Sequence, residues 1–225
     1  MSKVLLALDM DDTLCDTQEE VVIRLRRKLY DTAAWDDLKW VYDSVHANRK
    51  HGTHSTMLYP PHLRDIINKD IIQEGGYVKT VKPTKLITDG EFVKMLYRLR
   101  DVLADDLTTV IATHRNNEQE VYQGTVDWLD GVDFSKHLND LHFIDSREYS
   151  NKIEYLKMLY PEHEILLLDD NPFGNLQTVH HPHESVLVYE GLCTYDAYKH
   201  QNKFRSVNAL GNMIIDFSGR DDNEK

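Results

Sequence analysis

Two pairs of aspartates stand where buried strands would end. Asp9 and Asp11 follow the apolar run Val4–Leu8, and Asp169 and Asp170 follow the apolar run Ile165–Leu168. Short, continuously apolar runs predict parallel strands covered on both faces, and ligands of such sheets bind beyond the carboxyl ends of the strands. If the two strands are neighbours, the four carboxylates converge, and like charges at close range raise one another's pKa unless a cation neutralises them. Oxygen ligands with open positions favour Mg²⁺, so the sequence predicts a magnesium site.

Further polar side chains fall at strand ends and helix starts, where a phosphate group could bind. Thr113 follows the apolar run Thr109–Ala112, His114 and Arg115 come next, and Lys152 opens a predicted helix. A hydroxyl, a lysine and the amides of a helix N-terminus are groups that bind phosphate. Each residue also has a simpler alternative: an Asp or Thr after a strand caps a turn or helix, a lysine is solvated, and Arg115 pairs with an acid. Taken as a set, they predict a phosphate site.

Four segments resemble the motifs of haloacid dehalogenase-like phosphohydrolases. LLALDMDDTL resembles the first motif, a strand followed by Asp-x-Asp-x-Thr or Val, and TTVIATHR resembles the second, a strand that ends in Thr or Ser. SNKIEYL is similar to the third motif, which carries a lysine, and ILLLDDNP is similar to the fourth, which carries paired acids. The four segments occur in the family's order and span nearly the whole chain outside one insertion. Asp12 departs from the pattern, because many members carry Gly there; we interpret it as a solvent-exposed turn residue.

The resemblance implies a role for each motif residue. Asp9 would be the nucleophile that attacks phosphorus and forms an aspartyl-phosphate, while Asp11 would protonate the leaving oxygen and then deprotonate the attacking water. Mg²⁺ would be held by an oxygen of Asp9, the main-chain carbonyl of Asp11 and an acid of the fourth motif. Thr113 and Lys152 would bind the phosphoryl oxygens. An acid at position 11 favours a phosphatase or a phosphomutase over a dehalogenase or an ion pump.

The apolar patterns predict an α/β fold with a Rossmann-like, doubly wound parallel sheet. Five strand-sized runs stand out: Val4–Leu8, Thr109–Ala112, Leu141–Ile144, Ile165–Leu168 and Val186–Tyr189. Helical periodicity lies between them, in Glu91–Leu103 and in Asn151–Tyr160. Strands that alternate with helices are typical of parallel sheets.

The segment from residue 16 to residue 83 interrupts this alternation and predicts an inserted helical subdomain. It has no comparable strand run, and its apolar residues repeat at helical spacing. Thr17 and Glu20 have the spacing of a capping box, and Gly75 and Gly76 end the last helical pattern. We therefore expect a core of residues 1–15 and 84–225 with a helical cap over 16–83. Such caps close over small substrates. The layout and the fourth motif are similar to those of 5'(3')-deoxyribonucleotidases, which makes a nucleoside monophosphate the favoured substrate.

Basic and aromatic side chains of the predicted cap are candidates for contact with the leaving group. One basic cluster contains His46, Arg49, Lys50, His51 and His54. It contacts a second anionic or polar end of the substrate, with Arg49 and Lys50 as the candidates, or else it forms a solvated loop. Aromatic side chains of the cap could stack on a base, but the helical spacing of Trp35 and Tyr42 favours packing in the core.

Composition bounds the remaining function classes. The 225 residues are 41% hydrophobic and 28% charged, which is typical of a folded globular protein and excludes wholesale disorder. Twenty-six basic against 38 acidic side chains give a net charge of −12, which disfavours binding to nucleic acid or to an anionic membrane. Cys15 and Cys193 match no metal or redox spacing, and no 18-residue apolar stretch occurs. We expect a cytoplasmic monomer or small homo-oligomer.

The expected function is that of a Mg²⁺-dependent phosphomonoesterase acting on a small phosphorylated metabolite, with a 5'-nucleotidase or deoxyribonucleotidase as the first candidate. A sugar-phosphate phosphatase or a phosphomutase with the same core is the alternative among enzymes. A non-catalytic protein that binds a phosphorylated ligand is the alternative from another class. None of the acids that the resemblance makes catalytic is missing, which favours an enzyme.

Overall fold

A six-stranded parallel sheet forms the centre of the computed structural model, which describes residues 3–49, 56–174, 183–190 and 202–219. Its strands are β1 (Lys3–Leu8), β2 (Leu107–Thr113), β3 (Asp140–Phe143), β4 (His163–Leu168), β5 (Val186–Tyr189) and β6 (Lys203–Phe204). The strand order is β3-β2-β1-β4-β5-β6, and every neighbouring pair is parallel. The order reverses between β1 and β4, which is the place where doubly wound sheets bind ligands. The predicted α/β fold with a Rossmann-like parallel sheet is confirmed.

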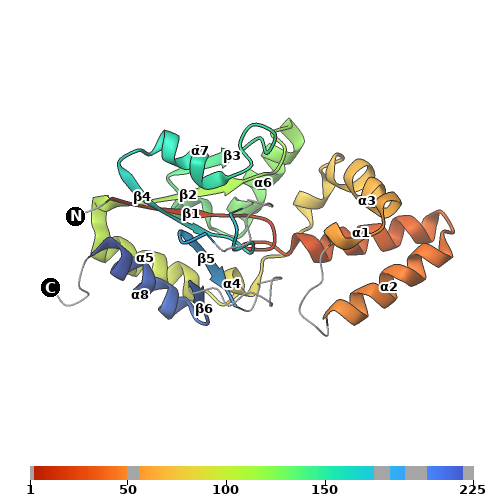
Figure 1. The fold of residues 1–225 in the computed structure, drawn as a ribbon, viewed down its shortest axis with the longest axis horizontal. Helices are drawn as coiled ribbons and strands as arrows, with labels where there is room; N and C mark the ends of the chain where they lie inside the picture. Colours follow the sequence, from red (N-terminus) through yellow and green to blue (C-terminus); the bar gives the residue numbers. More distant parts are fainter. Residues whose placement is uncertain (1–2, 50–55, 175–182, 191–201, 220–225) are drawn as a thin grey trace.

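Helices cover both faces of the sheet because successive side chains of a buried strand point to opposite sides. Val4, Leu6 and Leu8 of β1 pack in one apolar cluster with helices α5 (Glu91–Leu103) and α8 (Val207–Ser218). Leu5 and Ala7 pack in another cluster with α7 (Lys152–Leu159) on the opposite face. Figure 1 shows α5 and α8 side by side below the sheet and α7 above it. The remaining helices of this part are α4 (Lys85–Thr88) and α6 (Gln119–Gly131).

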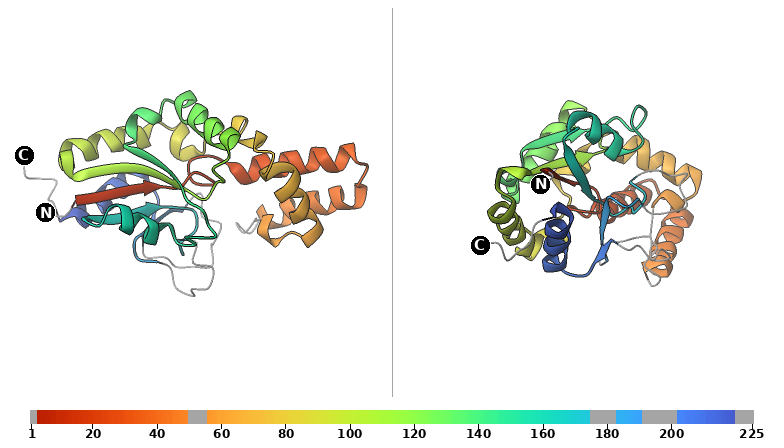
Figure 2. Two further views of the ribbon diagram at one scale, coloured as in Figure 1. Left: turned by 90° about the horizontal axis from the view of Figure 1, so that it is seen from above. Right: turned by 60° about the vertical axis from the view of Figure 1, so that its left-hand side comes forward.

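The segment after the first aspartates is helical, as predicted. It contains α1 (Thr17–Asp31), α2 (Trp35–Arg49), the 3₁₀ turn η1 (Thr56–Leu58), α3 (Pro61–Ile67), the π-helical turn η2 (Asn68–Ile72) and the 3₁₀ turn η3 (Gly76–Lys79). Helices α1, α2 and α3 project away from the sheet in Figure 1 and in the left view of Figure 2. Their apolar residues form a cluster of their own, to which the α/β part contributes Val121 of α6 and the partly buried Phe143 of β3. Most of the buried apolar surface of this segment is therefore independent of the sheet.

Two connecting segments, one near residue 15 and one near residue 83, join the helical segment to the α/β part, and they lie side by side. The amide of Asp16 donates to the carbonyl of Lys82 at 2.8 Å, and the amide of Thr84 donates to the carbonyl of Leu14 at 2.9 Å. The hydroxyl of Thr84 also donates to the carbonyl of Thr13 at 2.8 Å. These bonds lie near the expected boundaries at residues 16 and 83, although the division into cap and core stays a prediction.

Two local expectations for the helical segment are wrong. The N-cap of α1 is Asp16, whose carboxylate accepts the Glu19 amide, and not Thr17. Trp35 and Tyr42 are 56% and 53% exposed, because α2 buries the stripe that contains Val41 and Val45 instead. Helical periodicity identifies an amphipathic helix, but it does not determine how wide the buried stripe is.

Among the described residues, no helix is both long enough and apolar enough to cross a lipid bilayer.

Gly75 should be needed at the residue that precedes η3. Its φ is +68°, and a Cβ there would lie 2.8 Å from Cγ2 of Val121. We expect Gly75→Ala to lower the free energy of unfolding by about 1–3 kcal/mol, because the substitution adds both backbone strain and overlap. Gly131→Ala is the matched control, since a Cβ at Gly131 meets nothing within 4 Å. Urea unfolding measures both variants, and equal midpoints for the two would contradict the prediction.

Candidate active site

The ends of β1 and β4 bring three of the four predicted carboxylates together. Leu8 pairs with Leu168 in the parallel register, so Asp9 and Asp169 leave the sheet at the same level. The Asp9 amide donates to the carbonyl of Leu168 at 2.9 Å. One carboxylate oxygen from each of Asp9, Asp169 and Asp170 lies within 4.8 Å of the others. The convergence that the sequence predicted for these three acids is therefore present.

Lys152 lies between two of these acids and is itself buried. Its Nζ is 2.6 Å from Oδ1 of Asp9 and 2.9 Å from Oδ2 of Asp169. Asn151 caps the start of α7 by accepting the Ile153 amide at 2.9 Å, which sets the direction in which the helix presents Lys152. Burial lowers the pKa of Lys152, but the two carboxylates outweigh burial and hold the pKa above its ordinary value. Lys152 is therefore a fixed positive charge.

The positive charge of one lysine does not neutralise the negative charges of the three neighbouring carboxylates. Burial raises the pKa of Asp9 to about 8, and the charges of Asp169 and Asp11 add to the rise despite the opposing charge of Lys152. Burial and the charge of Asp169 also raise the pKa of Asp170 well above its ordinary value. Carboxylates in this state are stabilised by an added cation. The all-oxygen donor set from Asp9, Asp169 and Asp170 fits the preference of Mg²⁺.

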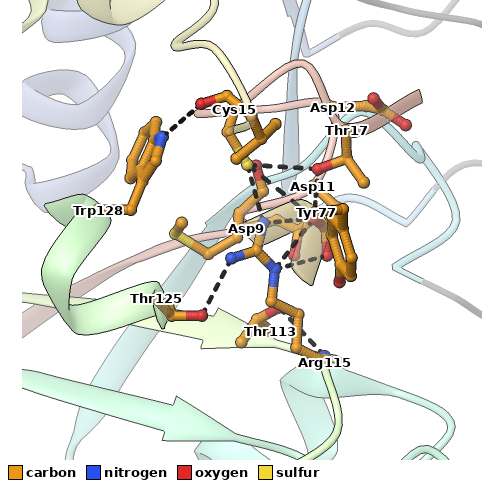
Figure 3. A network of polar contacts seen from close by, with 12 residues as sticks. Asp9, Asp11, Asp12, Cys15, Thr17, Tyr77, Thr113, Arg115, Thr125 and Trp128 are labelled. Carbon is orange, nitrogen blue, oxygen red and sulfur yellow. Dashed lines mark hydrogen bonds and ion pairs between the residues drawn. The ribbon is translucent and has the colours of Figure 1, made fainter. Parts of the chain in front are cut away.

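Asp11 points into a second network, where Arg115 holds it (Figure 3). Arg115 Nη2 is 2.6 Å from Oδ1 of Asp11, and Nε is 3.0 and 3.1 Å from its two oxygens. Nη1 donates to the hydroxyl of Thr125 at 3.0 Å. Burial would raise the pKa of Asp11, but the charge and hydrogen bonds of Arg115, with a hydrogen bond from Thr17, lower it below its ordinary value. Of the two alternatives for Arg115, the structure shows the one in which it pairs with an acid.

Both ends of the helical segment contact this network. Thr17, the first residue of α1, donates its hydroxyl to Oδ1 of Asp11 at 2.5 Å. Tyr77, in η3, places its ring 5.6 Å from Cζ of Arg115. Figure 3 shows Cys15, Thr17 and Tyr77 around the guanidinium and the Asp11 carboxylate. A movement of the helical segment would therefore change the contacts of Asp11, directly at Thr17 and through Arg115 at Tyr77.

Thr113 and His114 lie at the end of β2, as the sequence placed them. Thr113 is fully buried, and its Oγ1 accepts the Arg115 amide at 3.3 Å. Nε2 of His114 donates to the carbonyl of Tyr149 at 3.0 Å. Burial, followed by the charge of Lys152, lowers the pKa of His114 to about 4. His114 is therefore neutral near pH 7 and brings no positive charge to a phosphate.

Asp12 is a turn residue, as expected, but it is partly buried. Its φ is +60°, and its carboxylate accepts the Gln18 amide at 2.8 Å. Burial, with the charges of Asp11 and Asp16, raises the pKa of Asp12 to about 7. The expectation that Asp12 is simply solvent-exposed is wrong, because its carboxylate turns back toward the start of α1.

The two basic cap candidates are not placed. Lys50 and the side chain of Arg49 lie outside the residues that the structure describes. Sequence reasoning also missed four residues that build the site: Cys15, Tyr77, Thr125 and Asn151. Only Asn151 carried a usable signal, since Asn before a helical pattern is a common N-cap. The other three owe their place to contacts between distant parts of the chain.

Comparison with known proteins establishes the kind of fold. No family model matches the sequence, and no curated protein matches it. The structure resembles a predicted phosphatase from Clostridium acetobutylicum, with 11% identity, 96% of this chain and 100% of that chain covered, and a TM-score of 0.55. It also resembles a predicted phosphoglycolate phosphatase from Haemophilus somnus 129pt, with 12% identity, coverage of 95% and 99%, and a TM-score of 0.54. A third similar structure is the HAD-hydrolase YfnB from Bacillus subtilis bound to magnesium, with 13% identity, coverage of 95% and 99%, and a TM-score of 0.51. At these identities the likeness shows a haloacid dehalogenase-like α/β fold.

Removal of Arg115 should destabilise the protein. Its side chain is completely buried, whereas the Asp11 side chain that it pairs with is 30% exposed. We expect Arg115→Met to cost about 2–3 kcal/mol in urea unfolding, at the low end for a broken buried pair because Asp11 retains some solvent. Arg147→Met is the matched control, since Arg147 forms a similar fork with Asp145 on the surface. A midpoint for Arg115→Met that equals that of the control would contradict the account.

Divalent cations should stabilise the protein through the three acids. At a free Mg²⁺ concentration roughly ten times the dissociation constant, binding to the folded state adds about 1.4 kcal/mol. For a chain of this size we expect a rise in Tm of about 3–6 °C, measured by thermal unfolding with and without Mg²⁺. Asp169→Asn should abolish the rise, whereas Asp145→Asn, at the end of β3, should keep it. A rise that survives Asp169→Asn would show that the cation binds elsewhere.

Proposed function

We propose that this protein is a magnesium-dependent phosphomonoesterase that hydrolyses a small phosphorylated metabolite, with a nucleoside monophosphate as the favoured substrate. The observation that carries the proposal is the meeting of Asp9, Asp169 and Asp170, with Lys152 Nζ in contact with Asp9 and Asp169 and with Asp11 two residues beyond Asp9. The similar folds of a predicted phosphatase and a predicted phosphoglycolate phosphatase support it. The resemblance of all four sequence motifs supports the same reaction class.

Asp9 would act as the nucleophile. One of its oxygens would attack phosphorus in line, so that an O–P bond forms while the bond from phosphorus to the leaving oxygen breaks. Water would then attack the aspartyl-phosphate and release inorganic phosphate and the free carboxylate. Lys152 restricts the orientation of this carboxylate through its contact with Oδ1, which reduces the cost of aligning it for attack.

Asp11 would carry the proton in both steps. It would give a proton to the leaving oxygen and later accept one from the attacking water. In the structure Arg115 and Thr17 hold Asp11 ionised, which is the state that a general base needs. We propose that Arg115 is a positioning residue for Asp11, and that its contacts loosen when Asp11 acts as the acid.

Asp9, Asp169 and Asp170 would hold Mg²⁺, with the main-chain carbonyl of Asp11 as a further ligand. The raised pKa values of Asp9 and Asp170 and the all-oxygen donor set fit this ion. Bound Mg²⁺ would supply the positive charge that lets an anionic carboxylate approach an anionic phosphate. Among proteins of similar fold, YfnB is bound to magnesium.

Thr113 and Lys152 would bind the phosphoryl oxygens as charge develops on them. Both lie at the same edge of the sheet as Asp9, and Lys152 keeps its charge at neutral pH. The helical segment 16–83 would act as a cap that covers the substrate, which favours a small leaving group over a macromolecule. Closure of the cap over the substrate would be a movement about the two connecting segments, which are joined to each other by hydrogen bonds.

A turnover assay with an aryl phosphate and a panel of nucleoside monophosphates tests the proposal. We expect Asp9→Asn to lower kcat by at least about a thousandfold, because the nucleophile is lost while the shape of the side chain is kept. Asp145→Asn should retain wild-type turnover, and a chelator should abolish it. Equal rates for wild type and Asp9→Asn, or indifference to the chelator, would contradict the proposal. Preferential hydrolysis or isomerisation of hexose phosphates would favour the sugar-phosphate alternative.

A further inference from the structure

A cavity of about 430 Å³ lies between the start of α1 and the α3–η2 helical stretch. Asp12 and Thr17 are among the residues that line it. Thr17 donates to the carboxylate of Asp11, and Asp12 follows Asp11 directly. The cavity therefore adjoins the loop that carries the proposed nucleophile and the proposed proton carrier. From there it extends along the helical segment, where the leaving group of a substrate would lie.

The lining of the cavity combines apolar side chains with polar ones, among them the carboxylate-bearing Asp65. The apolar side chains include Val21 of α1, which is 3% exposed, Ile67 of α3, which is 6% exposed, and Ile72 of η2. Hydroxyl groups placed against these side chains would lose hydrogen bonds to water without replacement. A hexose, which carries hydroxyls around its whole ring, would place some of them against these apolar side chains. A two-carbon acid would leave most of the volume unfilled.

Arg64 adds a polar group with a free donor to the same cavity. Its Nε is buried, and among the described residues it has no hydrogen-bond partner. Arg24 of the same segment is different: its Nε donates to Glu20 at 2.8 Å, and its Nη2 donates to the carbonyl of Gly76 at 2.9 Å. Buried donors of folded proteins are almost always paired, so an unpaired one that lines a cavity is expected to receive its partner from a ligand.

Gln18 and Asn68 line the cavity as well and carry amide groups. Gln18 Oε1 accepts the Thr56 amide at 2.6 Å, which fixes this side chain between α1 and η1. A ligand that suits this setting has flat apolar faces and hydrogen-bonding atoms confined to its edge. That is the chemistry of a nucleobase, whose faces pack on aliphatic side chains and whose edge, in every base except adenine, carries at least one carbonyl acceptor.

We infer that this cavity binds the base of a nucleoside 5'-monophosphate, and that Arg64 donates a hydrogen bond to a carbonyl oxygen at the edge of the base. The inference rests on the proposed phosphatase function and names the part of the substrate that the helical segment recognises. Arg64 is then a specificity-determining residue that takes no part in the reaction at phosphorus.

The test compares two substrates that differ only by the base. Uridine 5'-monophosphate and ribose 5-phosphate carry the same reacting phosphate on the same sugar. We expect Arg64→Met to raise KM for uridine 5'-monophosphate roughly tenfold, the loss of one charge-assisted hydrogen bond, with kcat changed less than about threefold. KM for ribose 5-phosphate should not change. Arg26→Met is the matched control, because the Nε of Arg26 in α1 is also buried without a partner among the described residues, but Arg26 stacks on Tyr42 at 4.3 Å and does not line the cavity. It should leave both substrates unchanged.

Several outcomes would overturn the inference. Equal effects of Arg64→Met on the two substrates, no effect on either, or a wild-type preference for ribose 5-phosphate would each do so. If Arg64→Met unfolds, Arg64→Lys replaces it; this variant keeps the charge but loses Nε, and it should show the same split in KM.

A binding measurement separates failure of the inference from failure of the proposed function. Calorimetry with uridine 5'-monophosphate, on wild type and Arg64→Met in the presence of a chelator, requires no turnover. If no phosphate ester is hydrolysed but Arg64→Met weakens nucleotide binding roughly tenfold, the proposed reaction fails and the base site stands. If turnover is normal and binding does not depend on Arg64, the base site fails and the phosphatase stands.

Discussion

Three carboxylates at the ends of two adjacent parallel strands repel one another, and the protein supplies one buried lysine among them. Lys152 contacts Asp9 and Asp169, yet the pKa of Asp9 still rises to about 8. Such an arrangement costs folding free energy unless a cation joins it. The sheet order and the cap of α7 by Asn151 both serve to hold this group in place. The repulsion between these carboxylates is best explained by a function in which they bind a cation.

Asp11 lies two residues from Asp9, but a different set of charged and polar groups surrounds it. Arg115 and Thr17 hold it ionised, whereas burial drives Asp9 toward its neutral form. A cation bound at Asp9 would favour the ionised carboxylate that a nucleophile needs. Because Thr17 and Tyr77 belong to opposite ends of the helical segment, the state of Asp11 is linked to the position of that segment. Binding of the leaving group by the helical segment would then also affect the position of Asp11, the proposed proton carrier.

Sequence patterns predicted the parts of this molecule that depend on local periodicity. Five of the six strands and helix α5 follow from apolar runs and helical spacing, but β6 has two residues and leaves no such pattern. Carboxylates after buried strands were predictable because parallel strands end at one edge. Contacts across the fold were not, and Arg115 meets Asp11 from 104 residues away. The exposure of Trp35 had the same cause, since the buried stripe of α2 is the one that joins the apolar cluster shared with α1 and α3.

The proposed reaction depends most directly on where a divalent cation binds. Crystals grown with Mn²⁺, which shares the octahedral oxygen preference of Mg²⁺, would locate the ion by its anomalous scattering. We predict a peak within about 2.5 Å of carboxylate oxygens from Asp9 and from Asp169 or Asp170. Ordered carboxylates with no peak among them at saturating Mn²⁺, or a peak held only by acids elsewhere, would contradict the central claim.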